Sequence, residues 1–344
     1  MDFYGISLKL GHYRSLTVRS FHTCVAGNLS TAAALADQGL ELALREGNPS
    51  NLAYLYMMQL IVRYYRGDLV GAESHFAAGL GFFDDPVFRQ PSHPFISTFG
   101  YASWNAWILG RADVARERSA KMKAAVNPAN PHDQPWADVL TAFLHALMRE
   151  SETAEALAAR ALDLCEKHGF PNDAAYCRIY LGYARAQLGE AAGHISLIRG
   201  GIDTLVQIGN RIGIPRYPTE LAAAQHRAGA VGDALETVEQ ALNFNPEELF
   251  YRSETLRIRG ELRLDQGVLQ LAEADFRDSI SLAKDMSAKA WELRATMSLA
   301  RLLNKQSRRD EARAMLAEIY GWFTEGFDTA DLKDASALLD ELSR

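Results

Sequence analysis

The sequence has few cysteines, little net charge and no long apolar segment. Its 344 residues include three cysteines, Cys24, Cys165 and Cys177, an odd number without close pairing. This excludes a disulfide framework and favours a reducing, cytoplasmic setting. A formal net charge of −7 without a basic stripe argues against nucleic acid as a partner. The longest uncharged apolar stretches, 48–62 and 93–110, are too short and too polar for a membrane span, and the first residues lack the pattern of a signal peptide.

The sequence also lacks the motifs of common catalytic and cofactor sites. It contains no P-loop, no H-E-x-x-H, no C-x-x-C and no G-x-S-x-G, and its nine histidines are scattered without metal-ligand spacing. The segment GLGFFD (79–84) has only a G-x-G and follows a helical segment, so a dinucleotide site is not expected. The acidic pair in FFDDP (82–86) is explained as a helix start. We therefore predict no cofactor, no metal and no catalytic activity in this chain.

Helix-forming residues are abundant and follow a regular period. Ala, Leu, Arg and Glu dominate, and alternating apolar patterns are almost absent, which predicts an all-α protein. A period kept over seven intervals is typical of a stacked repeat. The helix-length segments end at turn residues spaced 38 to 43 residues apart: Gly27, Gly67, Gly110, Glu150, Gly189, Gly229, Gly267 and Ser307.

Small side chains recur at fixed distances from these turns. We predict that two antiparallel helices cross closely at these places, because a bulky residue would force them apart. Alanine follows the turn by five residues in six repeats, at Ala32, Ala72, Ala115, Ala234, Ala272 and Ala312. Small residues also stand twelve residues after the turn (Gly39, Gly79, Gly201, Ala241, Ser279) and seven before it (Ser20, Ser103, Gly182, Ala222, Gly260, Ala300).

These features resemble tetratricopeptide repeats. The clearest copies are LGYARAQLGEAAG (181–193) and GELRLDQGVLQLAEADFRDSI (260–280), and the aromatic four residues after the alanine stands at Phe76 and Phe276. The period is longer than the ~34 residues of the standard repeat, so we expect helices of about 15–18 residues. The resemblance implies a right-handed superhelix of about eight helix pairs whose first helices line a concave groove.

We predict a single helical repeat domain over 1–344. Its repeats are expected at approximately 12–46, 49–83, 94–126, 134–168, 172–209, 216–244, 247–285 and 288–323, with a C-terminal capping helix at 328–342.

The C-terminal third carries a narrower resemblance. Residues 288–342 look like the end of bacterial cyclase-associated predicted ATPases, and residues 166–202 resemble the middle of the same array. The resemblance extends, more weakly, back to about residue 93. In those proteins an adenylate/guanylate cyclase-type domain and an ATP-binding domain precede a long tetratricopeptide array. The resemblance implies a regulatory role, and it assigns the nucleotide chemistry of those proteins to no residue of this chain.

An aromatic cluster at 320–327 precedes the last expected helix, 329–342. That helix would lay Leu332, Ala335, Leu338 and Leu339 over the exposed face of the eighth repeat, as a solenoid cap must. We therefore interpret Tyr320, Trp322, Phe323 and Phe327 as filling between the eighth repeat and the cap, rather than as a ligand pocket.

Counting back from each turn by 13, 10, 6 and 3 residues gives the positions expected to face the groove. An inner wall passing from aromatic to arginine-rich residues fits a peptide with an apolar body and an acidic end. The alternative is that the aromatics are core and the charges a solvated helix face with internal ion pairs. The candidate binding residues are Tyr54, Trp104, Trp107, Tyr176, Tyr183, Arg257, Arg294 and Arg301.

Three functions remain open from the sequence. The first is a non-catalytic scaffold or sensor that binds a protein, a peptide or a small effector, and regulates a cyclase or ATPase region. The second is an enzyme or small-molecule binder whose pocket lies in the concave groove. The third is self-association through exposed solenoid ends, because repeat arrays need caps to remain soluble.

Overall fold

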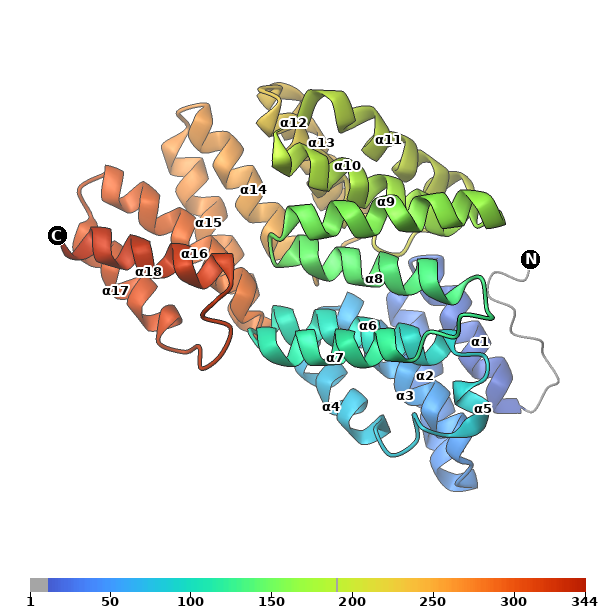
Figure 1. Ribbon diagram of the computed structural model, residues 1–344. Helices are drawn as coiled ribbons and strands as arrows, with labels where there is room; N and C mark the ends of the chain where they lie inside the picture. The colour runs from blue at the N-terminus through green and yellow to red at the C-terminus, as the bar shows by residue number, and fades with distance from the viewer. Residues whose placement is uncertain (1–11, 190) are drawn as a thin grey trace.

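The computed structural model describes residues 12–189 and 191–344, and over these residues the chain forms eighteen helices and no strand. The predicted fold class is confirmed: the chain is a right-handed, tetratricopeptide-like superhelix of eight helix pairs with a C-terminal capping helix (Figure 1). The helices are α1 (His12–Val25), α2 (Leu29–Glu46), α3 (Pro49–Tyr65), α4 (Leu69–Gly79), α5 (Pro86–Arg89), α6 (His93–Ile108), α7 (Ala112–Ala124), α8 (Asp133–Leu147), α9 (Ser151–His168), α10 (Pro171–Leu188), α11 (Ala191–Gln207), α12 (Arg216–Arg227), α13 (Val231–Phe244), α14 (Arg252–Asp265), α15 (Leu269–Asp285), α16 (Lys289–Lys305), α17 (Arg309–Tyr320) and α18 (Ala330–Ser343).

The turn within each pair contains one residue with a left-handed backbone. Six of these residues are glycines, which adopt positive φ without a Cβ penalty. In the fourth pair the left-handed residue is Arg149, with φ of 64°, one position before the expected Glu150. In the eighth pair it is Ser307, as expected, with φ of 63°. The glycines are Gly27, Gly67, Gly110, Gly189, Gly229 and Gly267.

The predicted close helix crossings are confirmed at the small positions. A Cβ added to Gly182 would lie 2.7 Å from Ile198 of the partner helix, and one added to Gly201 would lie 2.6 Å from Ile179. In the seventh pair a Cβ on Gly260 would lie 2.5 Å from the Phe276 ring. These distances leave no room for a side chain, so the repeated glycines set the helix spacing.

The C-terminal helix α18 covers the last pair as predicted. Leu332, Ala335 and Leu338 are buried against α16 and α17. The aromatic cluster before it divides: Phe323 is buried, whereas the side chains of Trp322 and Phe327 are 44% and 49% exposed. The prediction that all four aromatics fill the space between the eighth repeat and the cap is therefore wrong for Trp322 and Phe327.

Segments about 200 residues apart lie in contact, because the superhelix stacks on itself. Asn245 Nδ2 donates to the carbonyl of Gly27, 218 residues earlier, at 3.1 Å. Arg149 pairs with Asp331, 182 residues later, at 3.2 Å. With a period of about 40 residues, about five repeats make one superhelical turn. The second superhelical turn rests directly on the first.

We call this contact surface the seam. The Leu249 backbone N–H donates to the Tyr65 carbonyl at 2.9 Å across it. Its core is apolar, because Tyr64 packs on Phe250 with ring centroids 4.7 Å apart. One side consists of the turns at Gly27, Gly67, Gly110 and Arg149, and the other of the loops 208–215, 245–251 and 286–288 and the segment 321–334.

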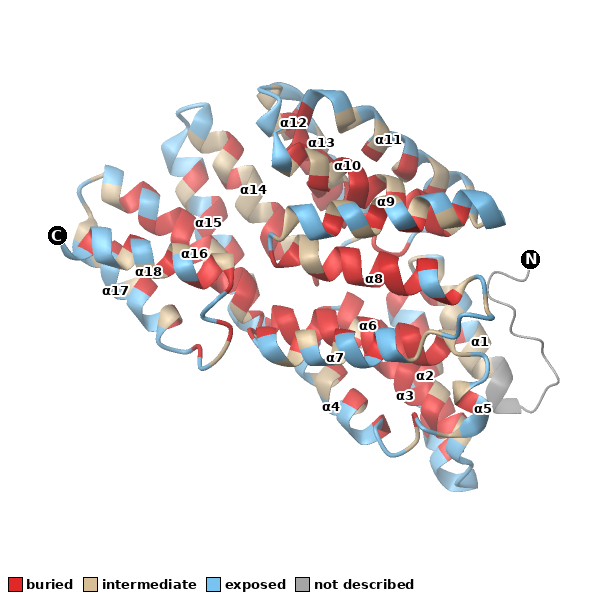
Figure 2. Ribbon diagram, viewed as in Figure 1, coloured by how far each residue is buried: buried red, intermediate tan, exposed pale blue. Residues whose placement is uncertain are grey.

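In the second to sixth pairs and in the eighth, the first helix is more buried than the second. Helices α3, α6, α8 and α16 are buried along most of their length, whereas α9 and α17 keep an exposed face (Figure 2). One hydrophobic core runs from α1 to α16 through the seam. The expected open concave groove is therefore largely filled by the chain's own side chains.

None of the helices in the described ranges is long and apolar enough to cross a membrane. The same residues include no cluster of His, Cys, Asp or Glu that could hold a metal ion. Cys165 and Cys177 are both buried, and a hydrogen bond with Cys165 together with burial raises the pKa of the Cys177 thiol. The division of the chain into one domain with the predicted repeat bounds stays a prediction.

Candidate functional site

The inner wall of the superhelix is the candidate site, and its tryptophans are buried. The Trp104 indole N–H donates to the Leu140 carbonyl at 2.9 Å. Trp107 meets Trp291 edge to face across the seam, with ring centroids 4.9 Å apart. Both tryptophans of α6 are under 5% exposed, so in this state they act as core residues.

The three candidate tyrosines differ in exposure. Tyr176 is buried, and its hydroxyl accepts a hydrogen bond from Asn210 Nδ2 at 2.7 Å. Tyr54 is half-buried and packs edge to face on Phe88 at 5.0 Å. Tyr183 is also half-buried, and desolvation raises the pKa of its hydroxyl to about 12. Tyr183 therefore stays neutral and is one inward tyrosine that a partner could reach.

The structure brings two of the three candidate arginines to one carboxylate, because Glu254 lies 2.7 Å from Arg257 and 3.9 Å from Arg294. Arg257 forms ion pairs along its own helix with Glu254 at 2.7 Å and with Glu261 at 3.3 Å. This matches the alternative interpretation of a charged helix face with internal pairs. Arg301 is exposed and stands seven residues after Arg294, about two turns further along α16.

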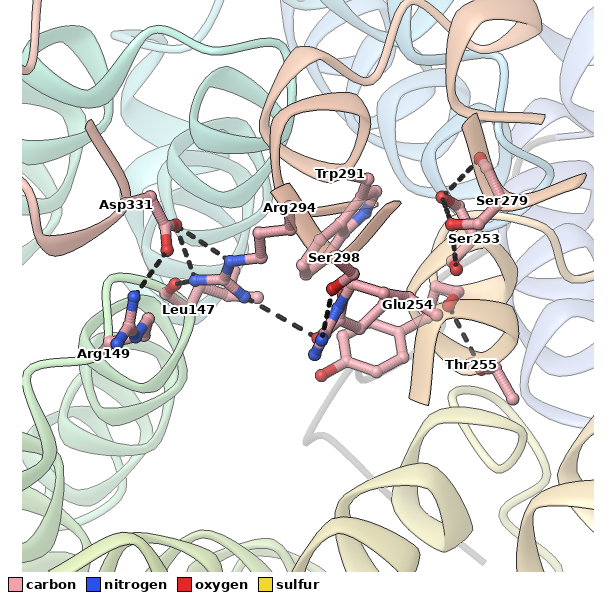
Figure 3. Close-up of polar contacts among 12 residues, drawn as sticks. Leu147, Arg149, Ser253, Glu254, Thr255, Ser279, Trp291, Arg294, Ser298 and Asp331 are labelled. Carbon is pink, nitrogen blue, oxygen red and sulfur yellow. Dashed lines mark hydrogen bonds and ion pairs between the residues drawn. The ribbon is translucent and has the colours of Figure 1, made fainter. Parts of the chain in front are cut away.

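Arg294 is the most connected of the candidates and lies at the end of the seam (Figure 3). Its guanidinium binds the Asp331 carboxylate at 2.8 Å and donates to the Leu147 carbonyl at 2.5 Å. It also lies over the Trp107 and Trp291 rings, at 4.9 and 5.3 Å from their centroids. Arg294 thus joins the fourth and eighth pairs and the cap through one planar group.

A second arginine, Arg149, also binds Asp331. Arg149 binds Asp331 at 3.2 Å and Asp334 at 2.7 Å, both in the first turn of α18 or just after it. Its left-handed backbone costs about 1 kcal/mol relative to glycine, which every other turn of the first four pairs uses. Two arginines therefore hold a helix-borne carboxylate, and the guanidinium of one of them, Arg294, lies over two indole rings. We call Arg149, Arg294, Trp107 and Trp291 the carboxylate clamp.

A buried charged cluster near the superhelix axis was not among the candidates. The Arg216 guanidinium lies 3.8 Å from the Phe143 ring centroid and 4.4 Å from that of Tyr217. It also donates to the Tyr180 hydroxyl and lies 3.4 Å from Glu220. A signal was present in the sequence, because Arg216 stands thirteen residues before Gly229, at a position expected to face inward.

Two glutamates beside Arg216 are buried, and burial disfavours their charged form. Burial raises the pKa of Glu220 to about 7 and that of Glu248 to about 8, against a lowering effect of Arg216. Glu248 accepts a hydrogen bond from the Gly213 N–H at 3.2 Å. One oxygen of each carboxyl and the Tyr64 hydroxyl have no hydrogen-bond partner among the described residues. Such groups reduce the stability of the closed seam.

Comparison with known proteins identifies the fold of the chain but does not assign it to a family. No family model matches the chain. An uncharacterized protein of Rhizobium meliloti (strain 1021) is 24% identical over 237 residues, which are 65% of this chain and 23% of that protein. The chain therefore spans about a quarter of the length of this curated relative.

Solved structures share the superhelix at low sequence identity. A Rap protein in complex with competence and sporulation factor has a TM-score of 0.59 at 11% identity, over 96% of this chain and 97% of that chain. NprR in complex with its cognate peptide NprX has a TM-score of 0.57 at 14% identity, over 84% and 82%. A chain of the APC/C heterotetramer Cut9–Hcn1 has a TM-score of 0.57 at 14% identity, over 96% and 55%. This chain thus has the fold of tetratricopeptide-like helical repeat proteins.

Proposed function

We propose that the chain is a protein- or peptide-binding module that recognises an acidic segment through its inner wall, where the second superhelical turn meets the first. The observation that carries the proposal is the carboxylate clamp. In it, Arg149 and Arg294 hold the Asp331 carboxylate of the chain's own α18. Arg294 contacts one Asp331 oxygen and Arg149 the other, and such charge-assisted hydrogen bonds are among the stronger ones in proteins.

The neighbouring inner wall offers a continuation for a bound segment. Tyr183 is half-buried, Arg301 is exposed, and Arg257 retains 17% of its side-chain exposure. An acidic peptide lying along α10, α14 and α16 would meet an aromatic ring first and guanidinium groups next. Two structural neighbours, the Rap protein and NprR, carry a factor or a peptide in their complexes, which supports peptide binding here as well.

We further propose that this module is the regulatory C-terminal part of a cyclase- or ATPase-type bacterial signalling protein. The proposal rests on the resemblance of residues 166–202 and 288–342 to the arrays of such proteins. The Rhizobium meliloti relative, of which the matched segment is 23%, is consistent with an array inside a longer chain.

The experiment is selection of peptides from a random display library on the full chain, followed by fluorescence anisotropy with the selected peptides. We expect selected peptides to carry Asp or Glu next to apolar residues. Arg257→Ala with Arg301→Ala should weaken their binding about tenfold or more, because each charged hydrogen bond contributes about 1.5–3 kcal/mol. The double variant leaves the clamp intact.

A second pair of variants separates binding from fold. Asp331→Asn with Asp334→Asn should strengthen binding, because it removes the internal carboxylates from the clamp. The matched control is Arg199→Ala with Arg313→Ala, two exposed arginines on the outer helices α11 and α17. Selection of peptides without acidic residues, or equal losses in the outer control, would contradict the proposal.

A further inference from the structure

Two connections between helix pairs are longer than stacking requires. The α2–α3 and α9–α10 connections are only residues 47–48 and 169–170. The longer loops 208–215 and 245–251 are explained, because they form one side of the seam. The α4–α6 connection, residues 80–92, and the α7–α8 connection, residues 125–132, have no such role. Long insertions in repeat proteins commonly form binding loops.

These two connections lie beside each other and line a partly open cavity of about 520 Å³. In Figure 1, α5 and the chain leading into α8 lie near each other at the N-terminal end of the first superhelical turn. The volume is within the range of about 300–1,000 Å³ that small-molecule sites occupy. The lining includes the polar side chains of Arg89, Gln90, Asn127 and Asn130 and the apolar side chains of Pro91 and Ala125.

The cavity has a built framework, because a buried carboxylate holds its two walls together. Asp133 is 0% exposed and accepts hydrogen bonds from the Ser92 hydroxyl on one loop. From the other loop it accepts the Asn127 N–H at 3.1 Å and Asn130 Nδ2 at 2.6 Å. The first loop is anchored further by Asp85, which caps α5 and accepts from Ser50 at 2.7 Å. The walls therefore keep their spacing in the folded protein.

The charges around the cavity do not favour an anion. Among the described residues, Arg89 is the one charged side chain that lines it, and its guanidinium is 3.3 Å from Asp84 and lies over the Phe95 ring at 4.0 Å. The Asp133 carboxylate lies in the adjoining framework. A phosphate or carboxylate would thus meet two nearby carboxylates and an arginine that is already paired.

The uncharged lining groups favour hydroxyls. The side chains of Gln90, Asn127 and Asn130 each carry an amide, which both donates and accepts hydrogen bonds. The Asn127 oxygen already accepts from the Ala129 N–H, and the Asn130 amide bonds Asp133 and the His132 N–H, so a ligand would meet chiefly the Gln90 amide and the Asn127 NH2 group. A hydroxyl group also does both, whereas Pro91 and Ala125 offer apolar contact for the C–H face of a ring. We propose that this cavity binds a neutral, polyhydroxylated small molecule of the size of a mono- or disaccharide. The site is distinct from the inner wall and goes beyond the proposed peptide binding.

The test uses the full chain with defined probes. Glucose, maltose and trehalose represent neutral ligands, and glucuronate and glucose 6-phosphate represent anionic ones. Binding is measured by saturation-transfer NMR and isothermal titration calorimetry. We expect binding of at least one neutral probe and at least tenfold weaker binding of the anionic probes.

Matched tryptophan variants locate the binding. Ala125→Trp fills the cavity and should reduce affinity for the neutral probe at least tenfold. Ala124→Trp adds the same ring at the neighbouring exposed residue, which does not line the cavity, and should leave affinity unchanged. Gln90→Ala removes one exposed amide without filling the cavity and should also reduce affinity for the neutral probe. This variant tests the proposal even if Ala125→Trp does not fold. Absence of binding by all three neutral probes, preference for the anionic probes, or unchanged affinity in Ala125→Trp and Gln90→Ala would overturn the proposal.

Discussion

Replacing Glu248 by glutamine should stabilise the protein, and the gain should increase with pH. Glu248 is 2% exposed in the loop that forms one side of the seam, and burial raises its pKa from 4.5 to about 8. Between these two values the folded state keeps a proton that the unfolded state has lost. Stability from this group is therefore complete below about pH 4.5 and falls as pH rises toward 8. Glutamine stays neutral and keeps an oxygen acceptor for the Gly213 N–H.

The magnitude follows from the difference between the two pKa values. A pKa difference of one corresponds to 1.36 kcal/mol, so the stability of wild type should fall by up to about 5 kcal/mol through Glu248 between about pH 4.5 and 8. The stability difference between Glu248→Gln and wild type should thus be near zero at about pH 5 and reach several kcal/mol at about pH 8. Glu220, whose pKa is raised to about 7, adds a smaller dependence of the same sign in both proteins.

The assay is urea unfolding of both proteins across this pH range, with hydrogen exchange as a local measure. The Leu249 and Phe250 amides, which donate to the Tyr65 carbonyl across the seam, should be more protected in Glu248→Gln at high pH. The control is Glu247→Gln, an exposed neighbour that accepts from the Ser30 N–H. A stability difference that is constant with pH, or one that shrinks as pH rises, would refute the reasoning.

Three further predictions concern packing. Gly67→Ala and Gly267→Ala both place alanine at φ of 78°, but only Gly67→Ala adds a Cβ against the second superhelical turn. Thermal unfolding should therefore show a stability loss that is larger by about 1–3 kcal/mol for Gly67→Ala than for Gly267→Ala. Equal losses would argue against a closed seam. Gly260→Ala should cost about 1–3 kcal/mol in urea unfolding, because its Cβ would lie 2.5 Å from Phe276. Truncation after Phe327 removes the cap and should cause aggregation in light scattering; a soluble, equally stable fragment would contradict the cap assignment.

Much of the fold could be predicted because each repeat is determined locally. The turn glycines, the small residues at the crossings and the amphipathic cap are features of neighbouring helices, and neighbouring helices are close in sequence. Gly182 and Gly201 illustrate this, since each meets a residue about twenty positions away. Arg149 shows the limit, because a left-handed arginine carries no local sequence signal.

The candidate site was harder to predict because it depends on the pitch of the superhelix. Helical spacing predicts that Trp107 and Arg294 face inward, and in the structure the Arg294 guanidinium lies over the Trp107 ring. Spacing does not reveal that Trp107 packs on Trp291, or that Arg294 binds Asp331. Those contacts join residues far apart in the chain, and small rotations accumulated over five repeats decide whether they form.

The sequence by itself therefore determined the repeat, its period, the helix pairs and the capping helix, because these follow from contacts between adjacent segments. Only the tertiary structure decided that the second superhelical turn closes on the first. That closure buries Arg216 and Glu248 near the axis and sets Trp322 and Phe323 over the turn at Gly110. The physical reason is that burial depends on what covers a residue, and here the cover comes from about five repeats away.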